Sequence, residues 1–488
     1  MGINGQKSLY NQLEETIVKL NEIVNINKEL KEENKALKIT IQELTEQTIK
    51  LMTEIDRLKN QINKNSSNSS KPGSTDNDNK PDKSGANLYN SRVNTGKSVG
   101  GQIGREGKNL SKENVEEMIK NKEVEVIETY HSINGNSEKA PVIKYRLGIK
   151  TIPVVEKHIF VYDEKSEGKL PLEFYTDVTY NDDFKSTCVQ LGSYNVVAID
   201  RLSDFINIIT NGVIKVSNGS ICNFYKEFSK LSENVVNELE EEVLNKKIIY
   251  TDLTGGGETE GKKIYFRNYS AEDIAIYKCH TKKGHAPIKE DNILPRFQGG
   301  IMGDHDTALY SYGANNYECN THASRYLEEL EQNISYISWP GELQELLFRI
   351  NSSVQIAKLF ELKEFDDEKI NEYLTEYDSI LEKAKKENNT IKSTFYKDKA
   401  KKLLNRLIKY KDNHLAFVKD FHIPFTNNLS EQDLRIVKTK IKISNFRSFN
   451  GAKNYANALT IIKTAKKRKI NPFLAIKNIF GRKPCFEH

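Results

Sequence analysis

The amino-terminal part of the chain carries a seven-residue repeat of apolar positions from Leu9 to Ile62. One heptad position holds Leu9, Thr16, Ile23, Leu30, Leu37, Leu44, Leu51 and Leu58, and the other holds Leu13, Leu20, Asn27, Asn34, Ile41, Thr48, Ile55 and Ile62. Leu at one core position and Ile at the other is typical of a parallel two-stranded coiled coil, in which a buried Asn pair favours the in-register dimer. We therefore predict a self-associating coiled coil over residues 1–62, with a long amphipathic helix packed on its own protein as the alternative.

A polar tract rich in Asn, Ser, Gly and Lys follows at residues 63–113 and holds almost no apolar side chains. Such a segment cannot bury a core, so we predict a flexible linker. From 114 to 180 apolar and polar residues alternate as they do in strands, for example in "EVEVIETY" and "VIKYRLGIK". This alternation predicts a small β-rich unit.

Residues 181–245 follow a helical spacing that predicts a helix-turn-helix. The apolar positions that would share one helix face are Val197, Ile199, Leu202, Phe205 and Ile208. Asn211 and Gly212 break the pattern, and Ser217 or Ser220 can begin a second helix that runs to about Leu231. A helix-turn-helix can read DNA, but two packed helices without that role are far commoner, so both interpretations stay open.

Three strands in close succession are predicted by "KKIIYTD", "KKIYFRNYS" and "DIAIYKCH", with a glycine-rich turn between the first two. After a helical stretch, "GGIMG" predicts a short strand that ends in Asp304, His305 and Asp306, and "NNYECNTHASRYLEEL" predicts a strand that runs into a helix. A Lys/Glu-rich helical region then extends from about 328 to 419. Beyond it, Glu431 falls in the first turn of a late helix, in capping-box spacing with Asn428.

These elements place single acids after the first and fourth strands and on the late helix, namely Asp252, Asp304 and Glu431. This order of elements matches the ribonuclease-H-like plan. We predict an α/β fold with such a catalytic core at 246–455, a helical insertion at about 328–419 and a basic C-terminal tail at 456–488. The plan serves phosphoryl transfer to nucleic acid, and a few rigid carboxylates that hold Mg²⁺ suit that chemistry. Asp252, ahead of a glycine-rich segment, can equally be an ordinary turn residue.

Composition narrows the class of protein. The 488 residues include 73 basic and 68 acidic side chains, a formal net charge of +5, and the charges are interspersed. Any nucleic-acid surface must therefore be local. The five cysteines are scattered and form no C-x-x-C pair, which indicates a reducing compartment. No apolar run has the length of a membrane span, so we expect a cytoplasmic protein, associated with the nucleoid when it binds DNA.

Several short blocks spread along the chain carry a stronger indication of function. They are "NSSNSSKPGSTD", "GGQIGREG", "IIYTDLTG", "GGIMGDHDTALYSYG", "CNTHASRYL" and "PFTNNLSEQDLR". In this order they resemble the large transposase of the insertion-sequence sixty-six family, a group of bacterial DDE transposases. The resemblance implies cleavage of element ends and strand transfer to target DNA, with Asp252, Asp304 and Glu431 as catalytic residues that bind Mg²⁺ or Mn²⁺. It also implies accessory proteins of the same element as partners.

The chain departs from the family pattern at several places. The family has two C-x-x-C pairs after the "GGQIGREG" block, whereas residues 108–172 contain no cysteine, so no zinc is expected. Ile103 and Arg105 stand where the family has Pro and His, and Gln432 stands where it has Arg, while Arg435 is retained. These departures affect DNA-end recognition more than carboxylate chemistry. They leave a catalytically silent DNA-binding protein derived from such a transposase as the alternative function.

Further residues could support the three acids. Asp306 leaves the same strand end as Asp304, but the block match favours Asp304 and would make Asp306 a helix N-cap. His322 and Arg325 lie three residues apart on one helix face, where they could contact the scissile phosphate or the acids, or pair with surface carboxylates.

The remaining candidates flank Glu431 or contain cysteine. Asn427 and Asn428 are either turn formers or donors to Glu431. The pair Cys279-His280 could join Cys319 and His322 as zinc ligands, but adjacent Cys and His are a poor ligand spacing.

Overall fold

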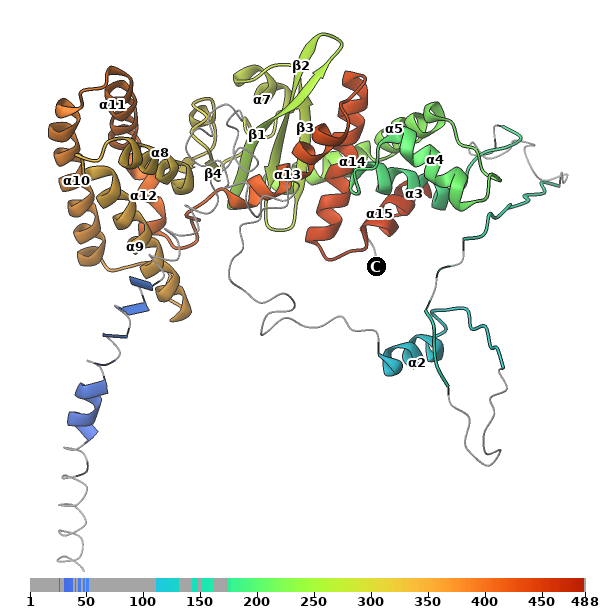
Figure 1. The fold of residues 1–488 in the computed structure, drawn as a ribbon, viewed down its shortest axis with the longest axis horizontal. Coiled ribbons are helices and arrows are strands. Elements are labelled where there is room, and N and C mark those ends of the chain that lie inside the picture. The colour runs from blue at the N-terminus through green and yellow to red at the C-terminus, as the bar shows by residue number, and fades with distance from the viewer. Residues whose placement is uncertain are drawn as a thin grey trace, which may run out of the picture. The chain divides into compact units, whose positions relative to one another are not determined.

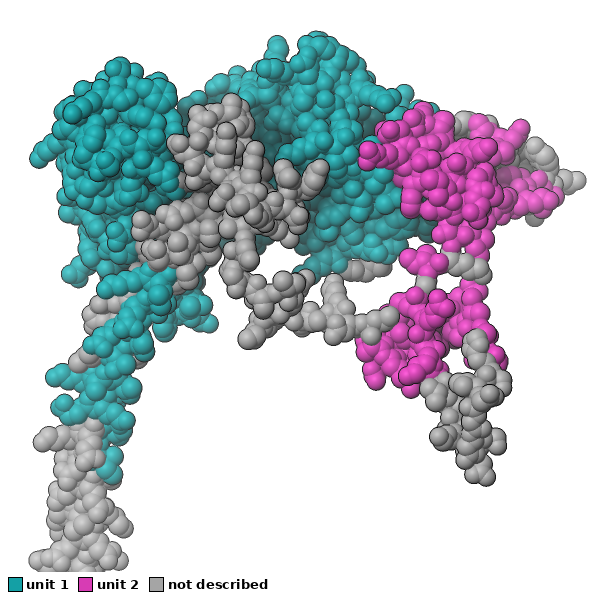
Figure 2. Space-filling model, viewed as in Figure 1, with its two compact units in different colours: residues 1–75, 180–198, 221–488 teal, residues 76–179, 199–220 magenta. Residues whose placement is uncertain are grey.

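The computed structural model describes residues 176–486 and, before them, 111–130, 143–147, 149, 151–161 and 174, with scattered positions between 26 and 51. The predicted linker up to residue 110 and most of the predicted coiled coil lie outside the described residues. The described positions between 26 and 51 are helical. The chain divides into two compact units (Figure 2), one of residues 1–75, 180–198 and 221–488 and one of residues 76–179 and 199–220.

The second unit contains helices α2 (Lys112–Lys120) and α4 (Ile199–Ile209). Between 114 and 180 the described residues form no strand, and apolar side chains such as Ile127 and Val155 are exposed. A strand needs a hydrogen-bonded neighbour and a covered face, so the alternation of apolar and polar residues is not enough to form one. The β-rich unit is not confirmed and stays a prediction.

Helix α4 and the turn after it follow the predicted order, but not the predicted face. Leu202 and Ile206 are buried, whereas Phe205 and Ile208 are exposed. Asn211 and Gly212 both adopt positive φ angles at the chain reversal. Helix α5 (Asn218–Leu231) then begins where the Ser217 hydroxyl accepts a hydrogen bond from Ser220 N at 3.0 Å.

The first unit is built on a five-stranded sheet of order β3-β2-β1-β4-β5 (Figure 1). Its strands are β1 (Ile248–Thr259), β2 (Lys262–Ser270), β3 (Ala275–His280), β4 (Gly300–Gly303) and β5 (Asn315–Glu318). β1, β2 and β3 pair antiparallel, whereas β4 and β5 run parallel to β1. The chain reaches β4 through α7 (His285–Asp291), and the 3₁₀ turn η3 (Leu309–Ser311) lies between β4 and β5.

The predicted end of the first strand at Asp252 was wrong. β1 continues to Thr259, and its tight turn is the pair Glu260-Gly261, both at positive φ. Pairing with β2 continues to Gly255, shifts register between Gly255 and Glu258, and resumes up to Thr259; a Cβ at Gly256 would lie 2.7 Å from the Phe266 ring. Parallel pairing with β4 nevertheless stops at Tyr250, so Asp252 stands just past the end of that ladder.

Helices α13 (Asn428–Ile443) and α14 (Phe449–Lys467) pack against the antiparallel strands (Figure 1). Their shared core includes Phe266, Tyr277, Leu434, Val437 and Leu459. Helix α15 (Pro472–Phe480) packs on α14 and on α3 (Asp182–Ser193), and α14 also contacts α6 (Glu233–Val243). The boundary predicted at residue 455 therefore falls inside α14, and residues 456–480 are mostly packed helix and not a tail.

Helices α8 (Asn320–Asn333), α9 (Trp339–Leu359), α10 (Asp367–Thr390), α11 (Thr394–Lys409) and α12 (Lys411–Lys419) occupy the segment between β5 and α13. They bury a common apolar core around Trp339, Leu343, Tyr377 and Leu407. A helical region was predicted here from about 328, and the structure begins it at Asn320. Among the described residues, no helix is both long and apolar enough to cross a membrane.

Candidate active site

Three elements of the first unit bring the predicted acids together. Asp252 lies on β1, Asp304 follows the last residue of β4, and Glu431 lies in the first turn of α13. β1 and β4 are neighbouring parallel strands, so residues just past their paired ends meet at one edge of the sheet. The carboxyl groups of Asp304 and Glu431 and the donor atoms of Cys319 and His322 all lie within 4.8 Å of one another.

Asp252 faces the same cleft, which has a volume of about 350 Å³. Residues that line it include Asp252, Arg267, Lys283, Asp304, Asp306, His322, Tyr326 and Arg406. Burial, and then the negative charge of Asp304, raises the pKa of Asp252 to about 7. Several carboxyl groups are therefore held closer than their charges favour, a condition that a bound cation would relieve.

His322 occupies the first turn of α8 and faces the acids. Its Nδ1 lies 2.8 Å from Asp304 Oδ1 and 3.8 Å from Glu431 Oε1. Burial favours the neutral ring, but the adjacent Asp304 carboxylate and Cys319 thiol raise the pKa of His322 to about 11. Arg325 Nη1 lies 3.3 Å from His322 Nε2, on the side of the imidazole away from the Nδ1 atom that contacts Asp304.

The residues present fit a divalent metal ion. Asp304 Oδ1 and His322 Nδ1 are buried and lie 2.8 Å from each other, and neither atom has a further well-aligned hydrogen bond. Two or three carboxylates on rigid elements suit Mg²⁺ or Mn²⁺. The zinc set that the sequence raised does not assemble, because His280 Nε2 lies 2.8 Å from Asp291 Oδ1 in a separate buried pair.

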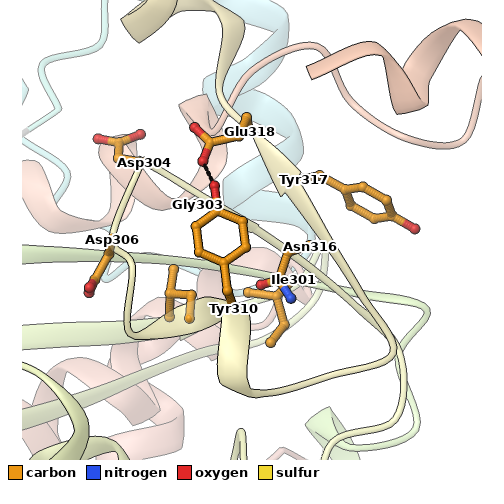
Figure 3. Close-up of a pocket in the computed structure, with 9 residues that line it drawn as sticks. Ile301, Gly303, Asp304, Asp306, Tyr310, Asn316, Tyr317 and Glu318 are labelled. Atoms are coloured by element: carbon orange, nitrogen blue, oxygen red, sulfur yellow. Dashed lines mark hydrogen bonds between the residues drawn. The ribbon is translucent and has the colours of Figure 1, made fainter. Parts of the chain in front are cut away.

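Asp304 and Asp306 leave the same turn in different directions (Figure 3). Asp306 Oδ2 lies 2.7 Å from Nη2 of the buried Arg267, and its Oδ1 accepts a hydrogen bond from Ala308 N at 3.1 Å. Asp306 thus closes the turn before η3 and neutralises Arg267. The structure places Asp304 in the cluster of potential ligands, as the sequence favoured.

His305, between these two acids, contacts Glu318 at the end of β5. Its Nδ1 lies 2.9 Å from Glu318 Oε1, and the same buried carboxylate accepts hydrogen bonds from Tyr310 and Arg406 (Figure 3 shows the Tyr310 bond). Sequence reasoning missed Glu318, Arg406 and Arg267. No local signal marks them, because each partner lies far away along the chain.

The start of α13 differs from the predicted capping box. Asn427 is the N-cap residue without a side-chain capping bond, and its Nδ2 donates to Thr251 O at 2.9 Å. Asn427 therefore ties α13 to β1 beside Asp252 and does not donate to Glu431. Asn428 is exposed, and Arg435 is exposed one turn beyond Glu431.

Two known protein families match parts of the chain. Residues 190–454 match the family described as "Transposase IS66 family", and residues 11–111 match a "Family of unknown function (DUF6444)". No curated protein and no solved structure matches the chain. The first match covers more than half of the chain and includes the three acids, Cys319 and His322. The chain belongs to the IS66 family of transposases.

Proposed function

We propose that this chain is an active DDE transposase that cleaves the ends of its element and joins them to target DNA. The catalytic residues would be Asp252, Asp304 and Glu431, on a ribonuclease-H-like core. The observation that carries the proposal is the proximity of these acids from β1, β4 and α13: Asp252 and Asp304 line one cleft, and Glu431 lies with Asp304 in the cluster of potential ligands. The order and directions of the five strands support the same core.

Mg²⁺ or Mn²⁺ held by the three carboxylates would supply the Lewis acid that stabilises the attacking and leaving oxygens of an in-line displacement. The chain's own residues would position the DNA. A phosphodiester is negatively charged, so it needs positive groups beside these acids. Lys283 at the cleft provides one, and His322 lies beside the acids with Arg325 Nη1 3.3 Å from its Nε2.

DNA contacts outside the cleft belong to the same proposal. The helices of residues 181–245 would bind the element ends, and the coiled coil of residues 1–62 would pair two chains. Accessory proteins of the element would join this assembly in the cytoplasm, at the nucleoid. The basic residues of α14 would contribute less to DNA binding than their number indicates. Lys463 and Lys467 lie 3.1 and 2.9 Å from Asp433, so their charges are already paired within the protein.

The test is strand cleavage and strand transfer on DNA that carries the element's ends, with Mg²⁺ and with EDTA. Wild type should form product only with metal, and Asp252→Ala should lower the rate at least about a hundredfold. Glu258→Ala removes an exposed acid from the same strand and serves as the matched control, with full activity expected.

The alternative is a catalytically silent DNA-binding protein, favoured by the departures at Ile103, Arg105 and Gln432. It predicts salt-dependent DNA binding by wild type and by Asp252→Ala, without product from either protein. Metal-dependent product from wild type would exclude this alternative.

A further inference from the structure

Asn268 is a fully buried amide on β2, directly opposite Asp252 in the β1–β2 register. Its Oδ1 accepts hydrogen bonds from Asp252 N at 3.1 Å and from Ser430 Oγ at 2.7 Å. Its Nδ2 donates to Ser270 Oγ at 2.9 Å and to Ser430 O at 3.3 Å. Every hydrogen-bonding position of the amide is therefore used, and its orientation is set by the Asp252 N–H on one side and the Ser430 carbonyl on the other.

Three of these four bonds join two elements that carry proposed catalytic acids, and the fourth stays within β2. Asp252 belongs to β1, while Ser430 immediately precedes Glu431 on α13. We propose that Asn268 is a positioning residue that fixes Glu431 relative to Asp252, at the separation a shared divalent cation requires. The inference rests on the proposed function, because it assigns Asn268 a task in that same site.

Only an amide meets the demands of this position. A carboxylate could accept from Asp252 N but could not donate to Ser430 O, and an apolar side chain could do neither. Either change would leave buried polar groups of the chain unpaired. The start of α13 would then be held to β1 chiefly by the Asn427 bond to Thr251 O.

The network continues away from the acids. Ser270 Oγ donates to Asp433 Oδ2 at 2.9 Å, and Asp433 pairs with Lys463 and Lys467 of α14. Asn268 thus lies between the site and a buried polar layer that holds α13 against α14. Partners outside the ligand shell orient the ligands themselves, and their loss typically lowers metal affinity or activity about 10–100-fold.

The experiment measures Mn²⁺ affinity directly, by electron paramagnetic resonance on the full-length protein, together with the Mn²⁺ concentration that gives half-maximal cleavage. Asn268→Ala should weaken Mn²⁺ binding roughly tenfold or more and shift the half-maximal concentration equally, with the rate recovering at high Mn²⁺. The matched control is Thr460→Val. Thr460 is also buried and joins α14 to the sheet through Tyr277 N at 3.0 Å, but it contacts neither Asp252 nor Glu431.

Equal Mn²⁺ affinity in wild type and Asn268→Ala, with stability lowered as in Thr460→Val, would make Asn268 an ordinary core amide and overturn the inference. If Asn268→Ala does not fold, Ser430→Ala removes only the 2.7 Å bond and should shift affinity in the same direction by a smaller factor; an unchanged affinity there also overturns it. A wild type that binds no more Mn²⁺ than Asp252→Ala would overturn the proposed function as well, which separates the two failures.

Discussion

Asp304 and Asp306, which both follow β4, pair with different groups: Asp306 lies beside the buried Arg267, and Asp304 lies beside His322. Arg267 is 1% exposed, and a guanidinium that far from water requires an acid beside it. Asp306 satisfies this requirement at 2.7 Å. Asp304 instead has its Oδ1 2.8 Å from His322 Nδ1, within the cluster of potential metal ligands.

His414 gives a second consequence of burial at the scale of single residues. Its ring is fully buried in α12, with Nδ1 3.0 Å from Asn320 Oδ1. Burial is the main cause that lowers its pKa to about 4; the charges of Arg406 and His305 add to the effect, and Glu318 opposes it. The folded chain therefore stays neutral here while the unfolded chain takes up a proton near pH 6.5.

We predict that the free energy of unfolding falls as the pH drops from about 6.5 to about 4, by up to about 1.4 kcal/mol per pH unit from His414. Above pH 6.5 both states are neutral and this contribution is constant. His414→Asn keeps a hydrogen-bond donor for Asn320 and removes the titrating imidazole. The free energy of unfolding of this variant should therefore change less with pH than that of wild type. Urea unfolding of both proteins at several pH values measures the difference; identical slopes would contradict the prediction.

At the scale of elements, the helical segment α8–α12 is anchored to the sheet through a buried ion pair. Arg406 of α11 donates to Glu318 at the end of β5; the Glu318 side chain is buried and that of Arg406 is 11% exposed. Arg406→Met should therefore lower the free energy of unfolding by about 3 kcal/mol, because it leaves the Glu318 charge buried with less compensation.

Adding Glu318→Gln to Arg406→Met should recover part of that loss, since the neutral amide tolerates burial better than an unpaired carboxylate. Chemical denaturation of the two single variants and the double variant measures this coupling. Strictly additive losses would mean that the pair does not connect α11 to β5 energetically.

An element could be predicted from the sequence when the interactions that define it join residues close together along the chain. The end of β4 at Asp304 and the strand-to-helix step into α8 follow from local patterns, and both were predicted. The extension of β1 through its glycines depends on pairing with β2, and the roles of Asn268 and Glu318 depend on partners in distant helices. A single sequence carries no signal for these long-range contacts, so they were not predicted.

At the scale of the whole molecule, the heptad leucines that the structure describes are exposed. Leu30, Leu37, Leu44 and Leu51, all at the same heptad position, are 47–67% exposed in the single chain. Repeated exposed leucines along one side of a helix are costly in water and are typical of a surface that pairs with another helix. This supports the predicted coiled coil as the contact between two chains.

We therefore predict that Leu37→Glu weakens self-association of the full-length protein, because it places a charge in each of two facing core positions. Lys35→Glu changes an exposed charge outside the leucine positions of the same helix and serves as the control. Sedimentation velocity over a range of concentrations measures the dissociation constant of the dimer. We expect this constant to be the same for wild type and Lys35→Glu, and roughly tenfold or more higher for Leu37→Glu. If Leu37→Glu sediments as wild type does, pairing through this repeat is excluded. If it becomes monomeric and also loses strand transfer while still nicking single ends, the coiled coil brings together the two ends that transposition joins.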